Sequence, residues 1–483
     1  MEIDIYWVEL NSLDVSACRE LTELWCSGLK LTSLNVSKNT KLINLYCANN
    51  NISALDLSKN TELEYLNCTS NVLSYLDVSA NSNLYALYCA NNKLTTLDLS
   101  SHSSISWINC SYNSITDLYL SSYVYYLDCS YNKLKTFTIA QGVGISELNC
   151  ANNELTSLDI KNAQNLYGLD CSNNNLTRLD VYKNTSLSEL NCDGNQLSEL
   201  NVRANTELMV LNCSNNRLTE LDVSKNTELH GLFCAWNYLT ALDLSSNADI
   251  FQLDCSNNYI EKSKLTGIDA DKLDTEGYDD NSYYGYYVYT FSPQAAGMPW
   301  VPPFLDVPRQ AWYLADVRYA LENSLFAGTS DTTFSPNDTM TRGMLATVLW
   351  RFAGKPASSG TAKFTDVPAD AYYSAPVAWA QENGIVRGTS DTTFSPDDAI
   401  TREQFTAILY KYAGKLGKAS AAGLPGIDFF DRDDISGYAV DSVRWCVKAK
   451  IISGFPDGTF GPQENATRAQ VAKMLHVFAD TVK

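Results

Sequence analysis

Cysteine thiols are the reactive groups that this chain spaces most regularly. Its 483 residues include 14 cysteines, and twelve of them recur in register, with ten steps of 21 residues and one step of 19. Such thiols could bind a metal or form disulfides, but each occupies an apolar position of a repeat, where free cysteine packs as a small hydrophobe. Side chains that stack in register point the same way, which is poor geometry for a disulfide. We therefore predict buried thiols at Cys26, Cys47, Cys68, Cys89, Cys110, Cys129, Cys150, Cys171, Cys192, Cys213, Cys234 and Cys255.

Other groups with catalytic potential are sparse. The three histidines, His102, His230 and His476, are too scattered for a histidine metal site or a histidine-based catalytic dyad. The chain contains no Gly-x-Ser-x-Gly, His-Glu-x-x-His, P-loop or Rossmann fingerprint. A pair of carboxylates could in principle hydrolyse glycosides, but a flat repeat offers no pocket for them. The sequence therefore predicts a protein that is not an enzyme and that needs neither a metal nor a cofactor.

Charge and hydropathy limit the classes of partner that this chain could bind. Lys and Arg number 35 against 55 Asp and Glu, a net charge of −20 that argues against nucleic acid. No apolar run approaches 18 residues, so no transmembrane helix is predicted. Residues 1–298 hold 35 acids and 17 bases, whereas residues 299–483 hold 20 acids and 18 bases. The resulting net charges of −18 and −2 indicate two units with different partners.

The 21-residue period predicts a solenoid. Leu45 and Cys47 alternate with more polar positions, which gives each repeat a short strand with one inward face, and stacking these strands buries a continuous core. A column of asparagines that begins at Asn50 is expected to bond backbone groups at the turn. The pattern resembles the nested, cysteine-containing leucine-rich repeats of bacteria over about residues 10–260, and we assign residues 1–265 to this solenoid. One unit reads Leu42-x-x-Leu45-x-Cys47-x-x-Asn50-x-Ile52-x-x-Leu55-Asp56-Leu57-x-x-Asn60.

An acidic column follows the second half of the repeats. It is consistent with a stripe that binds divalent cations, or with carboxylates that bond their own turns, and we favour turn bonding. Its members are Asp56, Asp77, Asp98, Asp159, Asp180, Asp222 and Asp243.

Aromatic and amide side chains are displayed by the strands in the first half of the repeats. A surface that recognises a protein or a sugar would have this composition, and so would an ordinary solvated sheet. The candidate ligand-binding residues of this arc are Trp25, Tyr46, Tyr88, Trp107 and Phe233.

Residues 266–298 are assigned to a cap or linker. The tyrosine-rich segment 281–291 alternates enough to form a strand that closes the end of the solenoid, with an extended spacer as the alternative.

The last 185 residues repeat one pattern three times, over residues 299–358, 359–418 and 419–483. Each copy reads as a helix, a glycine turn with Phe-x-Pro, a threonine N-cap and a second amphipathic helix. An arginine follows the threonine in every copy, at the first position of the second helix. Guanidinium donors at a helix N-terminus suit a carboxylate, whereas capping and ion pairing inside a bundle are the alternative. The motifs that recur are Phe304-Leu-Asp306, Phe364-Thr-Asp366 and Phe429-Phe-Asp431, then Phe334-Ser-Pro336, Phe394-Ser-Pro396 and Phe460-Gly-Pro462, then Thr341-Arg342, Thr401-Arg402 and Thr467-Arg468.

This triplet resembles S-layer homology domains. The resemblance implies a helical bundle built by the three copies together, which binds a secondary cell-wall polysaccharide that often carries pyruvate ketals. The first copy departs from the family pattern at Gly343-Met344, where an acid or amide usually follows the arginine. Carried onto this sequence, the polysaccharide-binding candidates are Arg342, Arg402, Arg468, Asp306, Asp366, Asp431, Gly328, Gly388 and Gly454.

The predicted fold class is therefore α+β multidomain, with a β-rich solenoid followed by a mainly α-helical three-copy bundle. We expect an extracellular protein of a bacterial cell wall or S-layer, whose arc binds a protein of unknown identity. The alternative is a structural envelope component that associates with itself through the arc. The acidic start Met1-Glu-Ile-Asp does not read as a signal peptide, so a leader is expected to be missing from this sequence.

Overall fold

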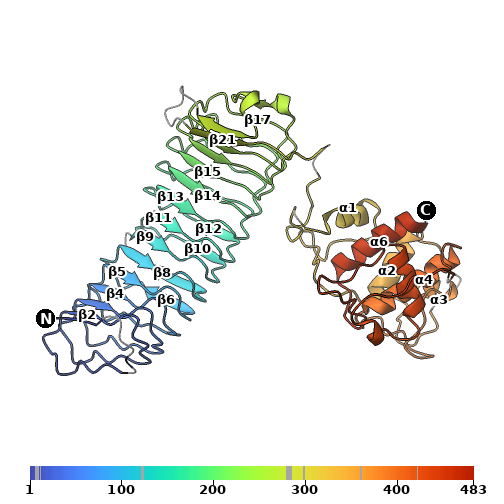
Figure 1. The fold of residues 1–483 in the computed structure, drawn as a ribbon, viewed down its shortest axis with the longest axis horizontal. Coiled ribbons are helices and arrows are strands. Elements are labelled where there is room, and N and C mark those ends of the chain that lie inside the picture. Colours follow the sequence, from blue (N-terminus) through green and yellow to red (C-terminus); the bar gives the residue numbers. More distant parts are fainter. Residues whose placement is uncertain are drawn as a thin grey trace. The chain divides into compact units, whose positions relative to one another are not determined.

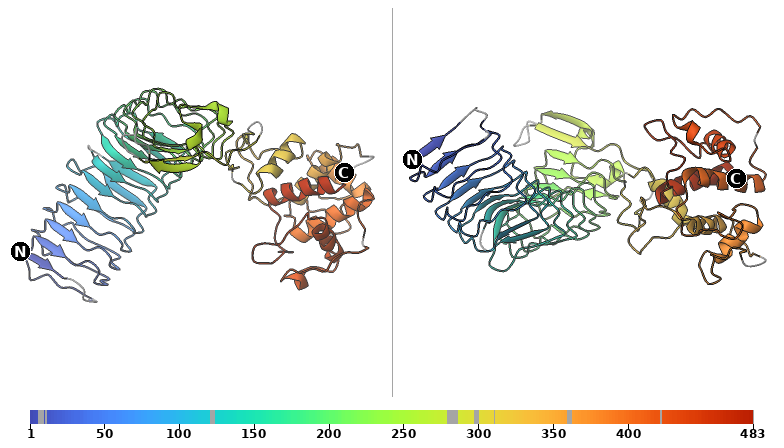
Figure 2. Two further views of the ribbon diagram at one scale, coloured as in Figure 1. Left: turned by 45° about the horizontal axis from the view of Figure 1, so that its top comes forward. Right: turned by 90° about the horizontal axis from the view of Figure 1, so that it is seen from below.

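The computed structural model describes residues 1–5, 10, 12–120, 124–278, 286–296, 300–309, 311–358, 362–420 and 422–482. The chain divides into an N-terminal unit, Met1–Val301, and a C-terminal unit, Pro302–Lys483. Figures 1 and 2 show a strand-rich solenoid in the first and a bundle of helices in the second. The predicted fold class is confirmed, and each unit is described by itself below.

Each repeat of the N-terminal unit contributes one short strand with an inward leucine. Leu24, Leu45 and Leu66 pair in parallel register on successive strands and are fully buried. Because alternate positions are buried, a slip of one residue would expose this whole row, and the register is therefore strongly specified. The described residues form a fifteen-stranded sheet (Figure 1) in the order β1 (Glu2–Asp4), β2 (Glu23–Trp25), β3 (Asn44–Tyr46), β4 (Tyr65–Asn67), β5 (Ala86–Tyr88), β7 (Trp107–Asn109), β9 (Val124–Asp128), β11 (Ile145–Asn149), β13 (Gly168–Asp170), β14 (Glu189–Asn191), β15 (Val210–Asn212), β16 (Gly231–Phe233), β18 (Gln252–Asp254), β21 (Tyr286–Thr290) and β20 (Thr275–Tyr278).

The second half of some repeats adds smaller strands and turns. Three two-stranded parallel sheets are formed by β6 (Thr96–Leu99) with β8 (Asp117–Leu120), β10 (Thr136–Thr138) with β12 (Ser157–Asp159), and β17 (Leu242–Asp243) with β19 (Leu265–Thr266). Short 3₁₀ turns lie at Lys262–Lys264 and Ala270–Lys272, and a third, in the C-terminal unit, at Arg432–Asp434.

The twelve regular cysteines line the solenoid core. All twelve are buried and free, which confirms their interpretation as core thiols. Burial raises the pKa of Cys26 and Cys68 to about 12, so these sulfurs stay protonated and are poor nucleophiles.

The asparagine column joins neighbouring repeats, as predicted. Asn50 Nδ2 donates to the carbonyl oxygens of Cys26 (2.9 Å) and Cys47 (3.0 Å), and its Oδ1 accepts from the N–H of Leu31 (2.9 Å). The same bonds recur at the equivalent residues along the stack, such as Asn216. One side chain thus bonds several buried backbone groups, and carbonyls such as Cys47 O accept from the asparagines of two successive repeats.

The acidic column forms turns. Asp56 Oδ1 accepts from Ser58 N at 2.9 Å, and Asp77, Asp98, Asp222 and Asp243 bond the second residue after them in the same way. These contacts confirm the turn-bonding interpretation over a cation stripe.

A tyrosine-rich strand ends the solenoid. β21 pairs in parallel with β18 and antiparallel with β20, so the strand predicted to close this end is present in its described part. Tyr289 is buried, and its hydroxyl donates to the Ile250 carbonyl at 2.8 Å. Residues 281–285 of the predicted strand lie outside the described residues.

The C-terminal unit contains two helices per copy, and they pair between copies. Helix α2 of the first copy packs on α3 of the second, α4 of the second on α5 of the third, and α6 of the third on α1 of the first. Threonine caps all three second helices as predicted: the hydroxyl of Thr341 accepts from Met344 N, that of Thr401 from Gln404 N and that of Thr467 from Gln470 N. The helices are α1 (Leu314–Glu322), α2 (Arg342–Phe352), α3 (Ser374–Glu382), α4 (Arg402–Lys415), α5 (Val440–Lys448) and α6 (Arg468–Val482).

Three backbone hydrogen bonds close the copies into a cycle. Met340 N donates to Ala466 O, Ala466 N to Ile400 O and Ile400 N to Met340 O, each at 2.9 Å. Each copy therefore contacts both of the others at the segment before its capping threonine. Across the described part of the chain, no helix combines the length and the apolar character that crossing a bilayer requires.

Candidate functional site

The three predicted arginines each reach into a loop of the next copy. Arg342 Nε donates to Phe394 O (2.8 Å), Arg402 Nε to Phe460 O (2.7 Å) and Arg468 Nε to Phe334 O (2.6 Å). The structure thus assembles one site three times, each from a helix N-terminus of one copy and the Phe-x-Pro turn of another.

Each guanidinium also stacks on the phenylalanine whose carbonyl it binds. The guanidinium carbon of Arg342, Arg402 and Arg468 lies 4.7, 5.1 and 4.7 Å from the respective ring centroid. Burial lowers the pKa of all three groups, and nearby carboxylates oppose that change. An arginine retains its charge under such a shift, so each site presents a cation held against an aromatic ring.

The three sites differ in the donors that they leave to a ligand. Arg342 and Arg468 each use an Nη2 group on a second carbonyl, those of Arg387 (2.9 Å) and Ala327 (2.8 Å). Arg402 bonds other described residues through Nε alone and lies 4.4 Å from a second ring, that of Phe455. Its two amino groups form no hydrogen bond to other described residues, although Arg402 is only 3% exposed and Arg342 is partly exposed.

The three predicted aspartates support the same loops. Asp306 accepts from the backbone N–H groups of Phe334 (2.7 Å) and Ser335 (2.6 Å), and Asp366 and Asp431 bind the equivalent pairs. Burial opposes ionisation of Asp366, yet the N–H donors outweigh it and hold its pKa below the ordinary value. These carboxylates hold the turn that carries the arginine-binding carbonyl.

The three predicted glycines are required by packing within the loop. A Cβ at Gly328 would lie 2.2 Å from Ser330 O, and one at Gly388 would lie 2.3 Å from Ser390 O. At Gly454 the nearest atoms would be 2.8 and 2.9 Å away. None of the three has positive φ, so close approach of neighbouring atoms explains the residue type.

Sequence reasoning missed Glu403. This side chain, next to Arg402, is 2% exposed and accepts from Ser436 N (2.9 Å), Ser436 Oγ (2.8 Å) and Tyr438 OH (2.9 Å). The available signal was its position, because only the second copy has an acid directly after the arginine. Glu403 makes the contact between the second and third copies different from the others.

The solenoid sheet carries a second candidate site, made of aromatic rings. Trp25 and Tyr46 stack at 3.6 Å between centroids, Tyr46 lies 4.7 Å from Tyr65, and Tyr65 lies 5.5 Å from Tyr88. On the strands that follow, Trp107 contacts Tyr125 and Tyr126 at 5.0 and 5.6 Å. We call this set the aromatic face; its members are Trp25, Tyr46, Tyr65, Tyr85, Tyr88, Trp107, Tyr125, Tyr126 and Tyr167.

The structure brings four of the five predicted arc residues onto this face. Phe233 lies apart, on β16. Five rings of the face were missed: Tyr65, Tyr85, Tyr125, Tyr126 and Tyr167. Tyr65 and Tyr126 lie two residues before the positions equivalent to Tyr46, and side chains two residues apart share one face of a strand. Tyr85, Tyr125 and Tyr167 lie three residues before those positions, so strand alternation does not predict them.

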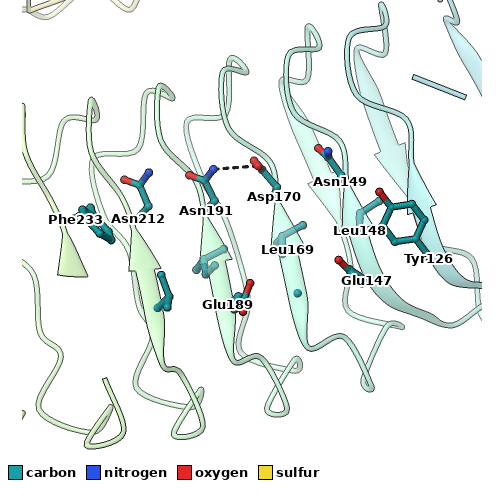
Figure 3. A pocket seen from close by; sticks show the side chains of 13 residues that line it. Tyr126, Glu147, Leu148, Asn149, Leu169, Asp170, Glu189, Asn191, Asn212 and Phe233 are labelled. Carbon is teal, nitrogen blue, oxygen red and sulfur yellow. Dashed lines mark hydrogen bonds between the residues drawn. The ribbon is translucent and has the colours of Figure 1, made fainter. Parts of the chain in front are cut away.

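An acidic hollow continues the aromatic face toward Phe233. It encloses about 440 Å³ between Tyr126 and Phe233 and is lined by Glu147, Asp170 and Glu189 on three successive strands (Figure 3). The Tyr167 hydroxyl donates to Glu147 at 2.8 Å, and Asn191 donates to Asp170 at 3.0 Å. Both carboxylates keep further lone pairs for a ligand.

The described strands of this sheet differ from the rest of the solenoid in charge. The fifteen described strands contain no lysine or arginine, although residues 1–298 contain 17. The same strands carry nine acids: Glu2, Asp4, Glu23, Asp128, Glu147, Asp170, Glu189, Asp254 and Glu276.

Comparison with known proteins identifies the C-terminal repeats. Residues 303–343, 363–406 and 429–472 match the model of the S-layer homology domain family. An endoglucanase of Bacillus sp. (strain KSM-635) is 34% identical over 173 residues, which are 36% of this chain and 18% of that protein. A cellulosome-anchoring protein of Acetivibrio thermocellus is 29% identical over 149 residues, which are 30% of this chain and 32% of that protein. The chain spans only 10% to 20% of the first three relatives.

Solved structures resemble the N-terminal unit. The functional domain of InlJ from Listeria monocytogenes, described as including a cysteine ladder, is 31% identical; the match covers 54% of this chain and 73% of that one, with a TM-score of 0.38. The internalin InlF from the same species is 22% identical, covers 56% and 85%, and has a TM-score of 0.47. The chain thus joins a β-solenoid, which resembles leucine-rich-repeat structures, to three S-layer homology domains, and these domains support attachment at a cell surface.

Proposed function

We propose that this chain, a leucine-rich-repeat solenoid joined to three S-layer homology domains, is held non-covalently on a secondary cell-wall polysaccharide and displays its solenoid to bind another protein. The domains supply attachment and the solenoid supplies a recognition surface. No bond-making step is part of this function.

The observation that carries the proposal is the arginine site repeated three times between copies. A guanidinium with donors to spare, an aromatic ring beneath it and a helix N-terminus together suit an anionic sugar. A pyruvate ketal on a sugar provides such a carboxylate. Arg402, with both amino groups unused by described residues, is the first residue that we assign to it. Asp306, Asp366, Asp431 and the three loop glycines act by holding the carbonyls that orient the arginines.

Sedimentation with cell walls tests the anchor. The full chain is mixed with Gram-positive sacculi, either intact or stripped of their secondary polymer, and the bound fraction is measured. We expect binding to intact walls alone, competition by the released polymer, and at least tenfold weaker binding for Arg402→Gln. The matched control is Arg318→Gln, because Arg318 is a half-exposed residue paired with Glu322.

Folding must be separated from binding, since Arg402 also bridges copies. Arg402→Lys keeps the charge and loses the bidentate fork, so a folded variant that binds poorly supports direct recognition. Circular dichroism of every variant provides the folding check. Equal binding by folded Arg402→Gln and the parent protein would remove this arginine from the site, and binding to stripped walls would refute the polymer as the ligand.

The alternative is a structural envelope protein that self-associates through the arc. The net charge of −18 on residues 1–298 opposes contact between two copies of this surface. Sedimentation velocity of the full chain across a range of concentrations separates the two proposals, because only the alternative expects dimers or larger species.

A further inference from the structure

The aromatic face is an exposed apolar surface on the side of the sheet that points away from the core. Tyr85, Trp107 and Tyr125 are 46%, 38% and 38% exposed although they lie within a cluster of rings. A contiguous exposed aromatic surface of this kind marks a site of interaction. Its rings contact one another within two clusters, one from Trp25 to Tyr88 and one from Trp107 to Tyr167, so little side-chain entropy is lost when a partner binds.

The charge of this surface indicates which kind of partner it would bind. The sheet that bears the rings has nine acids and no lysine or arginine among its described residues. Among the described residues of the solenoid, Lys41, Lys161 and Arg203 form ion pairs with Glu20, Asp159 and Asp222, and not with the carboxylates of the hollow, Glu147, Asp170 and Glu189. The carboxylates of the hollow can therefore attract cations of a partner, and the rings add cation–π attraction for ammonium and guanidinium groups.

We propose that the aromatic face and the adjoining acidic hollow bind an extended, lysine- and arginine-rich segment of a partner protein. This inference rests on the proposed role of the solenoid in protein binding and specifies the chemistry of the partner. Strands lie about 4.8 Å apart, so the surface from β2 to β16 spans about 50 Å, the length of about fifteen extended residues. Basic side chains of such a segment would alternate between the aromatic rings and the carboxylates of the hollow.

Fluorescence anisotropy with the full chain tests the inference. The probe is a labelled fifteen-residue peptide of alternating lysine and serine, compared with the same peptide acetylated on every lysine and with labelled chitohexaose. We expect the lysine peptide to bind, to bind more weakly as salt rises, and to bind at least tenfold more tightly than the acetylated peptide.

Matched variants locate the site. Glu64→Gln, Glu147→Gln and Glu189→Gln together remove three charges from the face or its edge, and Glu62→Gln, Glu199→Gln and Glu207→Gln remove three exposed charges elsewhere on the solenoid. We expect roughly tenfold weaker binding for the first triple variant and less than twofold change for the second.

A second pair of variants tests the rings. Tyr85→Ser, Trp107→Ser and Tyr125→Ser together should weaken binding by a similar factor, unlike Tyr75→Ser, Tyr119→Ser and Tyr182→Ser together. All six of these aromatic residues are exposed, so both sets should fold.

Each other outcome overturns the inference in an identifiable way. Equal loss in both glutamate triples would show that net charge, and not this face, attracts the peptide. Equal binding of the acetylated peptide would refute the cationic partner while leaving protein binding by the solenoid intact. Binding of chitohexaose alone would refute both the inference and the protein-binding part of the proposed function. No binding by any probe would refute the inference, whereas the wall anchor is judged separately by sedimentation.

Discussion

The two units of this protein both consist of sequence repeats, but they join them differently. In the solenoid each repeat contacts only the repeats before and after it, through strand pairing and the asparagine column. In the C-terminal unit the third copy returns to the first, through Arg468 and through Met340 N–H bonded to Ala466 O. A linear array can lose order locally, whereas a closed cycle of three copies is expected to unfold as one unit.

The way in which the repeats join also gives the two units different kinds of surface. The linear array repeats one position on every strand, so it spreads aromatic and acidic groups over an extended sheet. The cycle instead assembles a small site wherever two copies meet, from an arginine of one and a loop of the other. An extended partner suits the first arrangement, and a single charged sugar group suits the second.

The largest predicted effect is the loss of one asparagine of the column. Asn216→Ala removes the acceptor of the buried Leu197 N and one of the two asparagine donors of Cys192 O and of Cys213 O, which Asn195 and Asn237 still bind. We expect the free energy of unfolding of the solenoid to fall by about 2–4 kcal/mol in urea denaturation, since one buried N–H is left unpaired and two hydrogen bonds to carbonyls are lost. Asn175→Ala, at an exposed asparagine, is the control and should change it by less than about 0.5 kcal/mol. Similar losses in both variants would contradict the role given to the column.

In the C-terminal unit, alanine substitutions at two glycines should change the stability in opposite directions. Gly388→Ala places a Cβ 2.3 Å from Ser390 O and 2.4 Å from Thr393 O, so the loop must shift. We expect a loss of about 1–3 kcal/mol from overpacking, and weaker wall binding with it. Gly414→Ala, in an exposed helical position with no atom within 4 Å, should instead stabilise the unit by about 0.5 kcal/mol. Thermal unfolding followed by circular dichroism measures both, and a tolerated Gly388→Ala would show that the loop is free to adjust.

A smaller loss of stability is expected when a hydroxyl replaces one of the buried thiols of the repeats. Cys213→Ser replaces a buried thiol by a hydroxyl, which should lower the free energy of unfolding by about 1–2 kcal/mol. Cys18→Ser, at a partly exposed thiol outside the column, should be nearly neutral. Urea denaturation under reducing conditions compares them, and equal stability of the two variants would show that the column tolerates polarity.

The sequence was sufficient to predict the solenoid because its repeats are numerous and nearly identical. Twelve agreeing copies establish the period, the inward leucine and cysteine, and the asparagine that bonds the turn. The aromatic face was predicted only in part, since reading one column at a time separates Tyr46 from Tyr65. Those rings meet because two positions of neighbouring strands share one side of the sheet.

The C-terminal motifs were equally visible, but their pairing between copies was not. The sequence identifies Arg342, Phe394 and their equivalents as recurring residues. Nothing in one copy indicates that Arg342 ends on the phenylalanine turn of the next copy, because that contact depends on how helices of different copies pack. The aspartates illustrate the same limit, since their bonds to loop N–H groups emerge only from the folded turn.

The last prediction concerns stability at acid pH, and it compares carboxylates that bond turns in the two units. Asp243 accepts from the hydroxyls of Ser245 and Thr266, which lower its pKa from 3.8 to about 2. The folded value lies below the unfolded one, so its stabilising contribution is complete above about pH 4 and is lost as the pH falls toward 2. Asp243→Asn should therefore flatten the dependence of solenoid stability on pH between 4 and 2, and the comparison with the parent protein cancels the effect of net charge. Asp366→Asn should do the same in the C-terminal unit, because loop N–H groups lower the pKa of Asp366 despite its burial. Hydrogen exchange with peptide-level detection assigns each change to its unit. A pH dependence that Asp243→Asn leaves unaltered would show that this turn does not hold its carboxylate in the charged form.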